Sequence, residues 1–117
     1  MTDLNFEDII GRYFNLNLKK DNYRIYVEEA GQGTPLLCLH TAGSDGRQFR
    51  HILNDKRITN NYRVIVFDLP WHGKSNPPEG YELKDYKRTT TLYKEIIMSF
   101  CKQYKLIDPV IMGCSMG

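Results

Sequence analysis

The most informative stretch of this sequence is an apolar run, Val110-Ile111-Met112, followed by Gly113-Cys114-Ser115-Met116-Gly117. The second segment matches the pattern Gly-x-Ser-x-Gly, which is typical of a very sharp turn from a strand into a helix. Such a turn holds the serine in a strained backbone conformation, with its Oγ projecting above the sheet. We therefore interpret Ser115 as a nucleophile rather than as part of an ordinary Gly/Ser turn.

The residues that flank this serine fit the same chemistry. Side chains at positions 113 and 117 would collide with neighbouring elements, and the sequence has Gly113 and Gly117 there. The backbone N–H of Met116 is expected to point toward the place where an oxyanion forms, helped by the positive end of the following helix. The pattern thus predicts a nucleophile and one oxyanion donor in adjacent residues.

Two further apolar runs indicate strands that are buried on both faces, at residues 36–39 and 64–67. Helical patterns separate these runs: a short one over residues 47–53, after the plausible cap Ser44-Asp45, and a longer one over residues 84–104 with an apolar stripe. Strands that alternate with helices favour right-handed crossovers and a mostly parallel sheet. The fold class is therefore α/β.

The amino-terminal region has a different pattern. Residues 12–19 and 23–28 alternate apolar and polar side chains, and Asp21-Asn22 between them has the composition of a turn. We expect an antiparallel hairpin over residues 12–30 and a parallel βαβ portion over residues 35–117. Because no linker divides the sequence, the whole chain is expected to form part of a single domain.

Ligands of parallel α/β sheets bind beyond the carboxyl ends of the strands, so the residues after each apolar run need attention. The first run is followed by His40-Thr41-Ala42-Gly43-Ser44. The small residues Thr41, Ala42 and Gly43 let the backbone approach a bound acyl group, and the Ala42 N–H would supply a second oxyanion donor. His40 has two interpretations, a catalytic base or an imidazole that braces the loop through hydrogen bonds, and we favour the brace.

The second run is followed by Asp68-Leu69-Pro70-Trp71-His72-Gly73-Lys74-Ser75. This segment has the character of a tight loop whose polar groups fix one strand end to the next segment. We interpret Asp68 as a carboxylate that fixes the loop rather than as a triad acid. His72 is interpreted as a loop residue, whereas Trp71 either packs locally or lines the mouth of a substrate site.

Composition excludes several classes of function. The chain has 117 residues, of which 41% are hydrophobic and 26% charged, as in a globular protein. Its net charge of +2 is too small and too dispersed to favour nucleic acid or an anionic membrane as a partner. Three cysteines without metal-site spacing, an acidic amino terminus and no long apolar run favour a soluble, cytoplasmic protein with reduced thiols.

Taken together, these segments resemble the amino-terminal half of the α/β-hydrolase fold family, in its single-domain branch. The resemblance covers residues 13–117 and rests on three features in order: an oxyanion loop that begins with His, an Asp-x-Pro-x-His-Gly-x-Ser loop, and the nucleophile elbow. Two residues depart from the family pattern. Thr41 stands where many relatives have Gly, and Trp71 stands where Gly is frequent.

The resemblance also implies what lies beyond the sequence. The catalytic triad of this family follows the chain order Ser, then Asp or Glu, then His. Only Met116 and Gly117 follow Ser115, and all three histidines precede it: His40, His51 and His72. We therefore expect a chain that is truncated at the nucleophile elbow, lacks the triad acid and base, and is inactive on its own.

For the complete protein, the resemblance implies a serine hydrolase that acts on a small carboxylic ester or a related acyl compound. Ser115 would form an acyl-enzyme, and no metal or organic cofactor is implied. Acyl transfer and carbon–carbon bond hydrolysis remain alternatives on the same fold, as does a noncatalytic protein that binds a small ligand. Dehalogenation of the haloalkane type is disfavoured, because it needs a carboxylate in place of Ser115.

Overall fold

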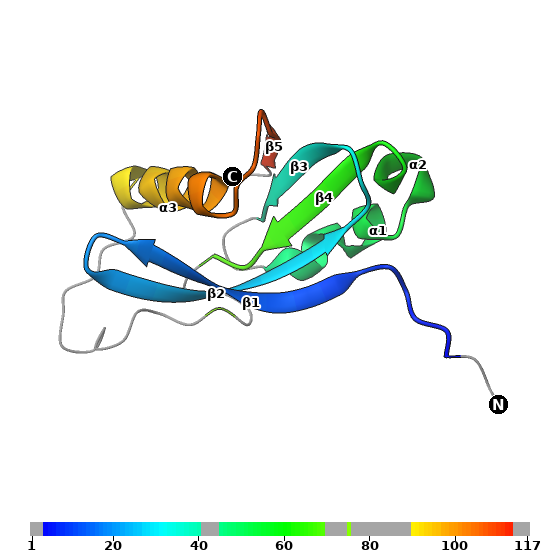
Figure 1. The fold of residues 1–117 in the computed structure, drawn as a ribbon, viewed down its shortest axis with the longest axis horizontal. Helices are drawn as coiled ribbons and strands as arrows, with labels where there is room; N and C mark the ends of the chain where they lie inside the picture. Colours follow the sequence, from blue (N-terminus) through cyan, green and yellow to red (C-terminus); the bar gives the residue numbers. More distant parts are fainter. Residues whose placement is uncertain (1–3, 41–44, 70–74, 76–89, 114–117) are drawn as a thin grey trace.

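The computed structural model describes residues 4–40, 45–69, 75 and 90–113. Within these ranges the chain forms five strands, one 3₁₀ helix (η1) and three α-helices (Figure 1). In chain order they are β1 (Ile10–Leu18), β2 (Asp21–Ala30), β3 (Thr34–Leu39), η1 (Gly46–Phe49), α1 (Arg50–Leu53), α2 (Lys56–Thr59), β4 (Tyr62–Phe67), α3 (Thr90–Gln103) and β5 (Val110–Gly113).

The five strands form one mixed sheet in the order β1-β2-β4-β3-β5. β1 pairs with β2 and β2 pairs with β4 in antiparallel orientation, whereas β3 is parallel to both β4 and β5. The predicted fold class is confirmed: an amino-terminal antiparallel hairpin joins three parallel strands, as expected of the amino-terminal part of an α/β-hydrolase fold.

The hairpin turn lies two residues earlier than the sequence predicts. Leu18 pairs with Asp21, so Lys19 and Lys20 form the turn, and Lys19 has a left-handed φ of 57°. The prediction of a turn at Asp21-Asn22 was wrong, because these residues begin β2. Cross-strand pairing explains the difference: Asn22 lies opposite Asn17, and its Nδ2 donates a hydrogen bond to Asn17 Oδ1 at 3.0 Å.

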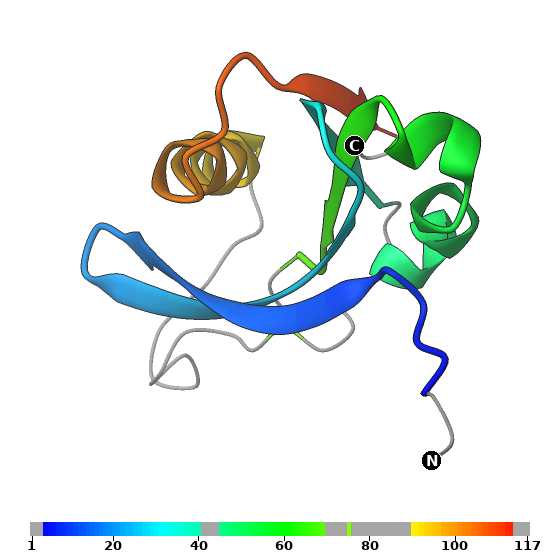
Figure 2. The same ribbon diagram turned by 45° about the vertical axis from the view of Figure 1, so that its right-hand side comes forward.

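One face of the sheet is covered by α3, as Figure 2 shows most clearly. Aromatic side chains dominate this contact. The ring of Phe100 stacks on Phe67 with centroids 4.4 Å apart, and on Tyr104 at 4.9 Å. Phe14 contacts the rings of Phe100 and Tyr104 edge-on. Leu37, Leu39 and Ile65 complete the buried floor under the helix, among other residues. The contact between α3 and the sheet therefore forms a large apolar core.

The opposite face of the sheet carries η1, α1 and α2 (Figure 2). Its core is smaller and consists of Ala30, Cys38, Phe49, Leu53, Val64 and Val66. Successive residues of β3 and β4 contribute alternately to the two cores, since side chains alternate across a strand. Burial on both faces explains why these strands appear in the sequence as continuous apolar runs.

The helices agree with the sequence in part. The helical pattern over residues 47–53 corresponds to η1 and α1 together, and Asp45 caps η1 by accepting a hydrogen bond from the N–H of Arg47. α2 was not predicted. The long helical pattern over residues 84–104 is confirmed as α3 where the structure describes it, and its first six residues lie outside the described ranges. None of the described helices has the length and apolar character needed to cross a membrane.

Candidate functional site

The carboxyl ends of the three parallel strands meet at one edge of the sheet, where the sequence places its polar motifs. His40 directly follows β3, Asp68 directly follows β4, and Gly113 ends β5. Leu39 pairs with Gly113, so the residue before His40 lies beside the residue that opens the Gly-x-Ser-x-Gly segment. This edge is the place where parallel α/β sheets bind ligands.

Six of the residues that the sequence assigns to the site lie outside the described residues. They are Thr41, Ala42, Gly43, Ser115, Met116 and Gly117. The structure describes the other three, His40, Asp68 and Gly113, together with the chain segments that enter and leave residues 41–44.

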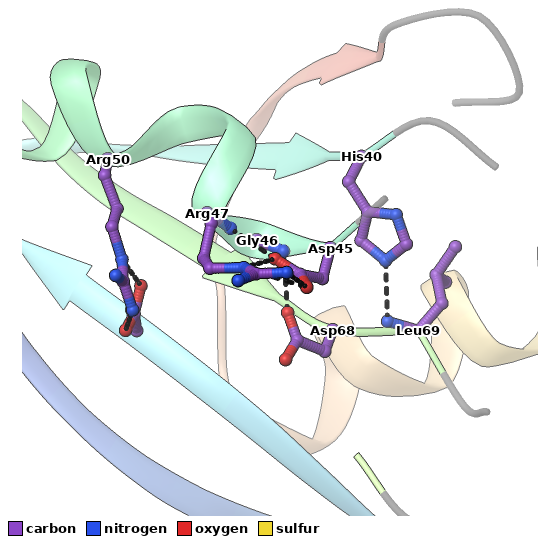
Figure 3. Close-up of polar contacts among 8 residues, drawn as sticks. His40, Asp45, Gly46, Arg47, Arg50, Asp68 and Leu69 are labelled. Atoms are coloured by element: carbon purple, nitrogen blue, oxygen red, sulfur yellow. Dashed lines mark hydrogen bonds and ion pairs between the residues drawn. The ribbon is translucent and has the colours of Figure 1, made fainter. Parts of the chain in front are cut away.

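His40 is fully buried and acts as a hydrogen-bond acceptor. The backbone N–H of Leu69 donates to His40 Nε2 at 3.0 Å (Figure 3). An imidazole nitrogen that accepts a hydrogen bond carries no hydrogen, so this arrangement requires the neutral ring with its proton on Nδ1. The bond links the end of β3 to the segment after β4, which is the kind of contact expected from a residue that braces the loop.

Asp68, the residue before Leu69, holds the start of η1 in a similar way. Its side chain is buried, and Asp68 Oδ1 accepts a hydrogen bond from the backbone N–H of Gly46 at 2.7 Å (Figure 3). The approach is close enough that a Cβ on residue 46 would lie 2.9 Å from Asp68 Oδ1 and 2.9 Å from Val66 Cγ1. Glycine at position 46 therefore permits the contact.

Asp45 is the second carboxylate at this edge, and its partner is Arg47. Asp45 Oδ1 accepts from both the backbone N–H and the Nε of Arg47, each at 2.9 Å. The hydrogen bond from the Arg47 side chain is the main reason that the pKa of Asp45 is lowered from its ordinary value. Asp45 thus stays ionised and is occupied in capping η1.

Ser75 forms hydrogen bonds with β2 and with the residue that follows β4. The N–H of Tyr26 donates to Ser75 Oγ at 2.9 Å, and the Ser75 hydroxyl donates to the carbonyl of Asp68. The N–H of Asp68 in turn donates to the carbonyl of Tyr26 at 2.9 Å. These three bonds hold the backbone of Asp68 against β2.

A third buried carboxylate, Glu28 of β2, lies on the η1 face of the sheet and was not predicted from the sequence. Arg50 donates to Glu28 Oε2 at 3.0 Å, and the hydroxyl of Tyr26 donates to the same oxygen at 3.2 Å. Gly11 of the neighbouring strand makes room for this hydroxyl, because a Cβ there would lie 2.1 Å from Tyr26 Oη. The sequence does show a Glu in the strand that alternates apolar and polar residues. It does not show that Arg50 of α1 is its partner, because only the fold brings the two together.

Cys38 lies between Leu37 and Leu39 on β3, fully buried near the strand end. Burial raises the pKa of its thiol to about 12, so the reactive thiolate is essentially absent near neutral pH. Cys38 is therefore a core residue and not a reactive thiol.

A mixed sheet with helices on both faces, and with polar loops at the carboxyl ends of its parallel strands, defines an α/β architecture of the hydrolase type. The sequence model of the alpha/beta hydrolase family matches residues 36–117. The chain therefore belongs to the alpha/beta hydrolase family.

Individual relatives agree with this assignment. The chain is 30% identical over 101 residues to the AB hydrolase superfamily protein YisY of Bacillus subtilis, which covers 84% of this chain and 34% of that protein. A crystal structure of the N-acyl homoserine lactonase AidH, in a mutant complexed with N-hexanoyl homoserine, is 31% identical with a TM-score of 0.74. The match covers 92% of this chain and 38% of AidH.

A third similar protein shares the fold at lower sequence identity. The epoxide hydrolase VrEH1 from Vigna radiata has a TM-score of 0.77 and 20% identity, covering 97% of this chain and 34% of that structure. The chain thus spans about a third of the length of these relatives, which are hydrolases or members of a hydrolase superfamily.

Proposed function

We propose that the protein is a serine hydrolase that acts on a small carboxylic ester or a related acyl compound, with Ser115 as the nucleophile. The observation that carries the proposal is the position of Gly113. This residue ends β5 beside the end of β3, and Ser115 follows it by two residues within the Gly-x-Ser-x-Gly pattern. A serine in such an elbow is presented at the carboxyl edge of the sheet.

In this proposal, Ser115 Oγ attacks the carbonyl carbon and forms a tetrahedral intermediate. The N–H groups of Ala42 and Met116 donate hydrogen bonds to its oxyanion, which is where such donors lower the barrier most. Collapse of the intermediate releases the alcohol and leaves an acyl-enzyme, which water then hydrolyses. A serine hydroxyl needs a general base, and the family order assigns that base to a His after Ser115, oriented by an Asp or Glu.

Similarity to AidH suggests which ester to test first. That protein is described as an N-acyl homoserine lactonase, and a lactone is a cyclic carboxylic ester. Attack of Ser115 on a lactone carbonyl would open the ring, with the alcohol still attached to the acyl group. We propose short acyl esters and lactones as the substrate class.

The test is replacement of Ser115 by Ala in the protein expressed at the full length that its gene encodes. Hydrolysis of p-nitrophenyl butyrate and of N-hexanoyl homoserine lactone should fall by about 10⁴-fold or more, because no other group on this path forms the acyl-enzyme. Cys114→Ala is the neighbouring control and should retain turnover. Ester turnover that survives Ser115→Ala would show that the assignment is wrong.

A further inference from the structure

His40 and Gly46, described residues on either side of positions 41–44, are hydrogen-bonded to two consecutive residues of another segment. On one side, Leu69 donates to His40 Nε2 at 3.0 Å, and on the other, Gly46 donates to Asp68 Oδ1 at 2.7 Å. Figure 3 shows the two bonds side by side, between the end of β3, the start of η1 and the segment after β4. His40 and Gly46 are thus both held against the segment that follows β4.

All the groups in this pair of bonds are shielded from water. His40 is 0% exposed, Leu69 3% and Asp68 5%, and Gly46 is also buried. Because no solvent competes for the buried donors and acceptors, removal of one partner leaves the other unpaired at a real cost. These bonds therefore restrict the positions of His40 and Gly46 more than exposed bonds of the same length would.

The carboxylate of Asp68 projects from a backbone that is itself held in place. Asp68 donates to the carbonyl of Tyr26 and accepts from the hydroxyl of Ser75, so it is joined to β2 as well as to β4. Asp45, the nearest other acid in sequence to Gly46, accepts its hydrogen bonds from Arg47 instead. The carboxylate that binds the N–H of Gly46 is that of Asp68.

We propose that Asp68 is a positioning residue for catalysis, which acts through the N–H of Gly46 to fix the point at which the chain re-enters the fold after residues 41–44. This inference rests on the proposed function, in which Ala42 supplies an oxyanion donor. A donor misplaced by about 1 Å lowers the rate of the chemical step by about 10²-fold, although the substrate still binds. Loss of Asp68 should therefore reduce kcat while leaving KM nearly unchanged.

The experiment compares three variants of the full-length protein with p-nitrophenyl butyrate as substrate. Asp68→Ala removes the acceptor and should lower kcat by roughly 10- to 100-fold, with KM within about threefold. Asp68→Asn keeps an acceptor oxygen and should retain kcat within about threefold. Glu28→Gln is the matched control, since it alters a buried carboxylate on the same face that contacts Arg50 and Tyr26, and its kcat should stay within about twofold.

Gly46→Ala keeps the N–H but places a Cβ 2.9 Å from both Asp68 Oδ1 and Val66 Cγ1, so residue 46 must move away from Asp68. Its kcat should also fall by about tenfold or more with KM nearly unchanged, and this variant decides the matter if Asp68→Ala does not fold. Full kcat in folded Asp68→Ala, or in Gly46→Ala, would overturn the inference. So would an equal loss of kcat in Glu28→Gln, because the effect would then be a general one of destabilisation.

Ser115→Ala separates this inference from the function on which it rests. If Ser115→Ala abolishes turnover and Asp68→Ala does not change kcat, the proposed function stands and the positioning role is wrong. If Ser115→Ala retains turnover, the proposed function itself is wrong, and any effect of Asp68 belongs to another reaction.

Discussion

The two faces of the sheet are built from different kinds of contact. Under α3 the contacts are mainly apolar, and the ring of Phe100 stacks on those of Phe67 and Tyr104 at 4.4 and 4.9 Å between centroids. Under η1 and α1 the apolar core is smaller, and the buried carboxylates of Asp68 and Asp45 accept hydrogen bonds from backbone N–H groups of η1 near the strand ends. Apolar burial scales with area and tolerates small shifts, whereas a hydrogen bond fixes a distance and a direction. The comparison suggests that the α3 face supplies stability and the η1 face sets the geometry of the site.

The largest test of this division is Phe100→Ala on the α3 face. Phe100 is fully buried, and its truncation should lower the free energy of unfolding by about 3–5 kcal/mol, because a cavity forms under the helix. Urea denaturation of the full-length protein measures the effect. Met98→Ala, on the same helix at 72% exposure, should change stability by no more than about 0.5 kcal/mol. Equal effects of the two substitutions would break the comparison.

Glu29 sharpens the comparison, because it is a polar group on the α3 face. It accepts hydrogen bonds from Arg63 at 2.7 Å, Arg12 at 3.0 Å and the hydroxyl of Tyr104 at 3.2 Å. Burial raises the pKa of Glu29, but its bonds with Arg63, Tyr104 and Arg12 outweigh burial and leave the pKa below the ordinary value of 4.5. Its ionised form is therefore stabilised by folding.

We expect Glu29→Gln to cost about 1–3 kcal/mol of stability at pH 7 while kcat is unchanged. Because the pKa of Glu29 is lower in the folded state, its contribution is present above pH 4.5 and is lost as the pH falls through the folded pKa. Unfolding measured between pH 7 and pH 3 should show the wild type and the variant converging in acid. A stability difference that stays constant or grows in acid would contradict this.

On the η1 side, Asp55→Ala should have a smaller effect. Asp55 caps α2 by accepting a hydrogen bond from the N–H of Arg57 at 3.0 Å, and loss of this exposed cap should lower stability less than Glu29→Gln does. Asp55→Asn keeps an equally good cap and should denature close to the wild type. Chemical denaturation compares the two variants, and identical losses would show that the cap is not the cause.

The smallest expected effect concerns Cys38, which should not react with iodoacetamide in the native protein. With a pKa of about 12, the thiol of Cys38 is ionised in about one molecule in 10⁴ at pH 8, and it is fully buried besides. Peptide mass spectrometry should find no label on Cys38 in the native protein and full label after denaturation in urea. Rapid native labelling of Cys38 would show that β3 opens easily.

The sequence predicted the strands more reliably than the turns. β3, β4 and β5 each lie where an apolar run predicts a strand. Burial explains the runs of β3 and β4, whereas β5 is the last strand of the described sheet and is largely exposed. The hairpin turn was misplaced because Asp21-Asn22 has turn-forming composition, yet cross-strand pairing sets the turn at Lys19-Lys20. α2 was missed since four residues are too few for a periodic pattern.

The site was predictable at the level of its loops but not of its contacts. His40 and Asp68 could be found because they follow apolar strands directly, at the edge where ligands bind. Their partners are the backbone N–H groups of Leu69 and Gly46, which leave no signature in a sequence. The strand order decides which loops become neighbours, and only the structure provides it.

The central claim, that Ser115 is an activated nucleophile, is tested most directly by reaction of the full-length protein with a fluorophosphonate. This reagent forms a stable bond with a serine Oγ that a neighbouring base has activated. Mass spectrometry of the digested protein should find one phosphonyl group, located on Ser115, and none in Ser115→Ala. A protein that remains unlabelled, or that carries the label on another residue, would contradict the account.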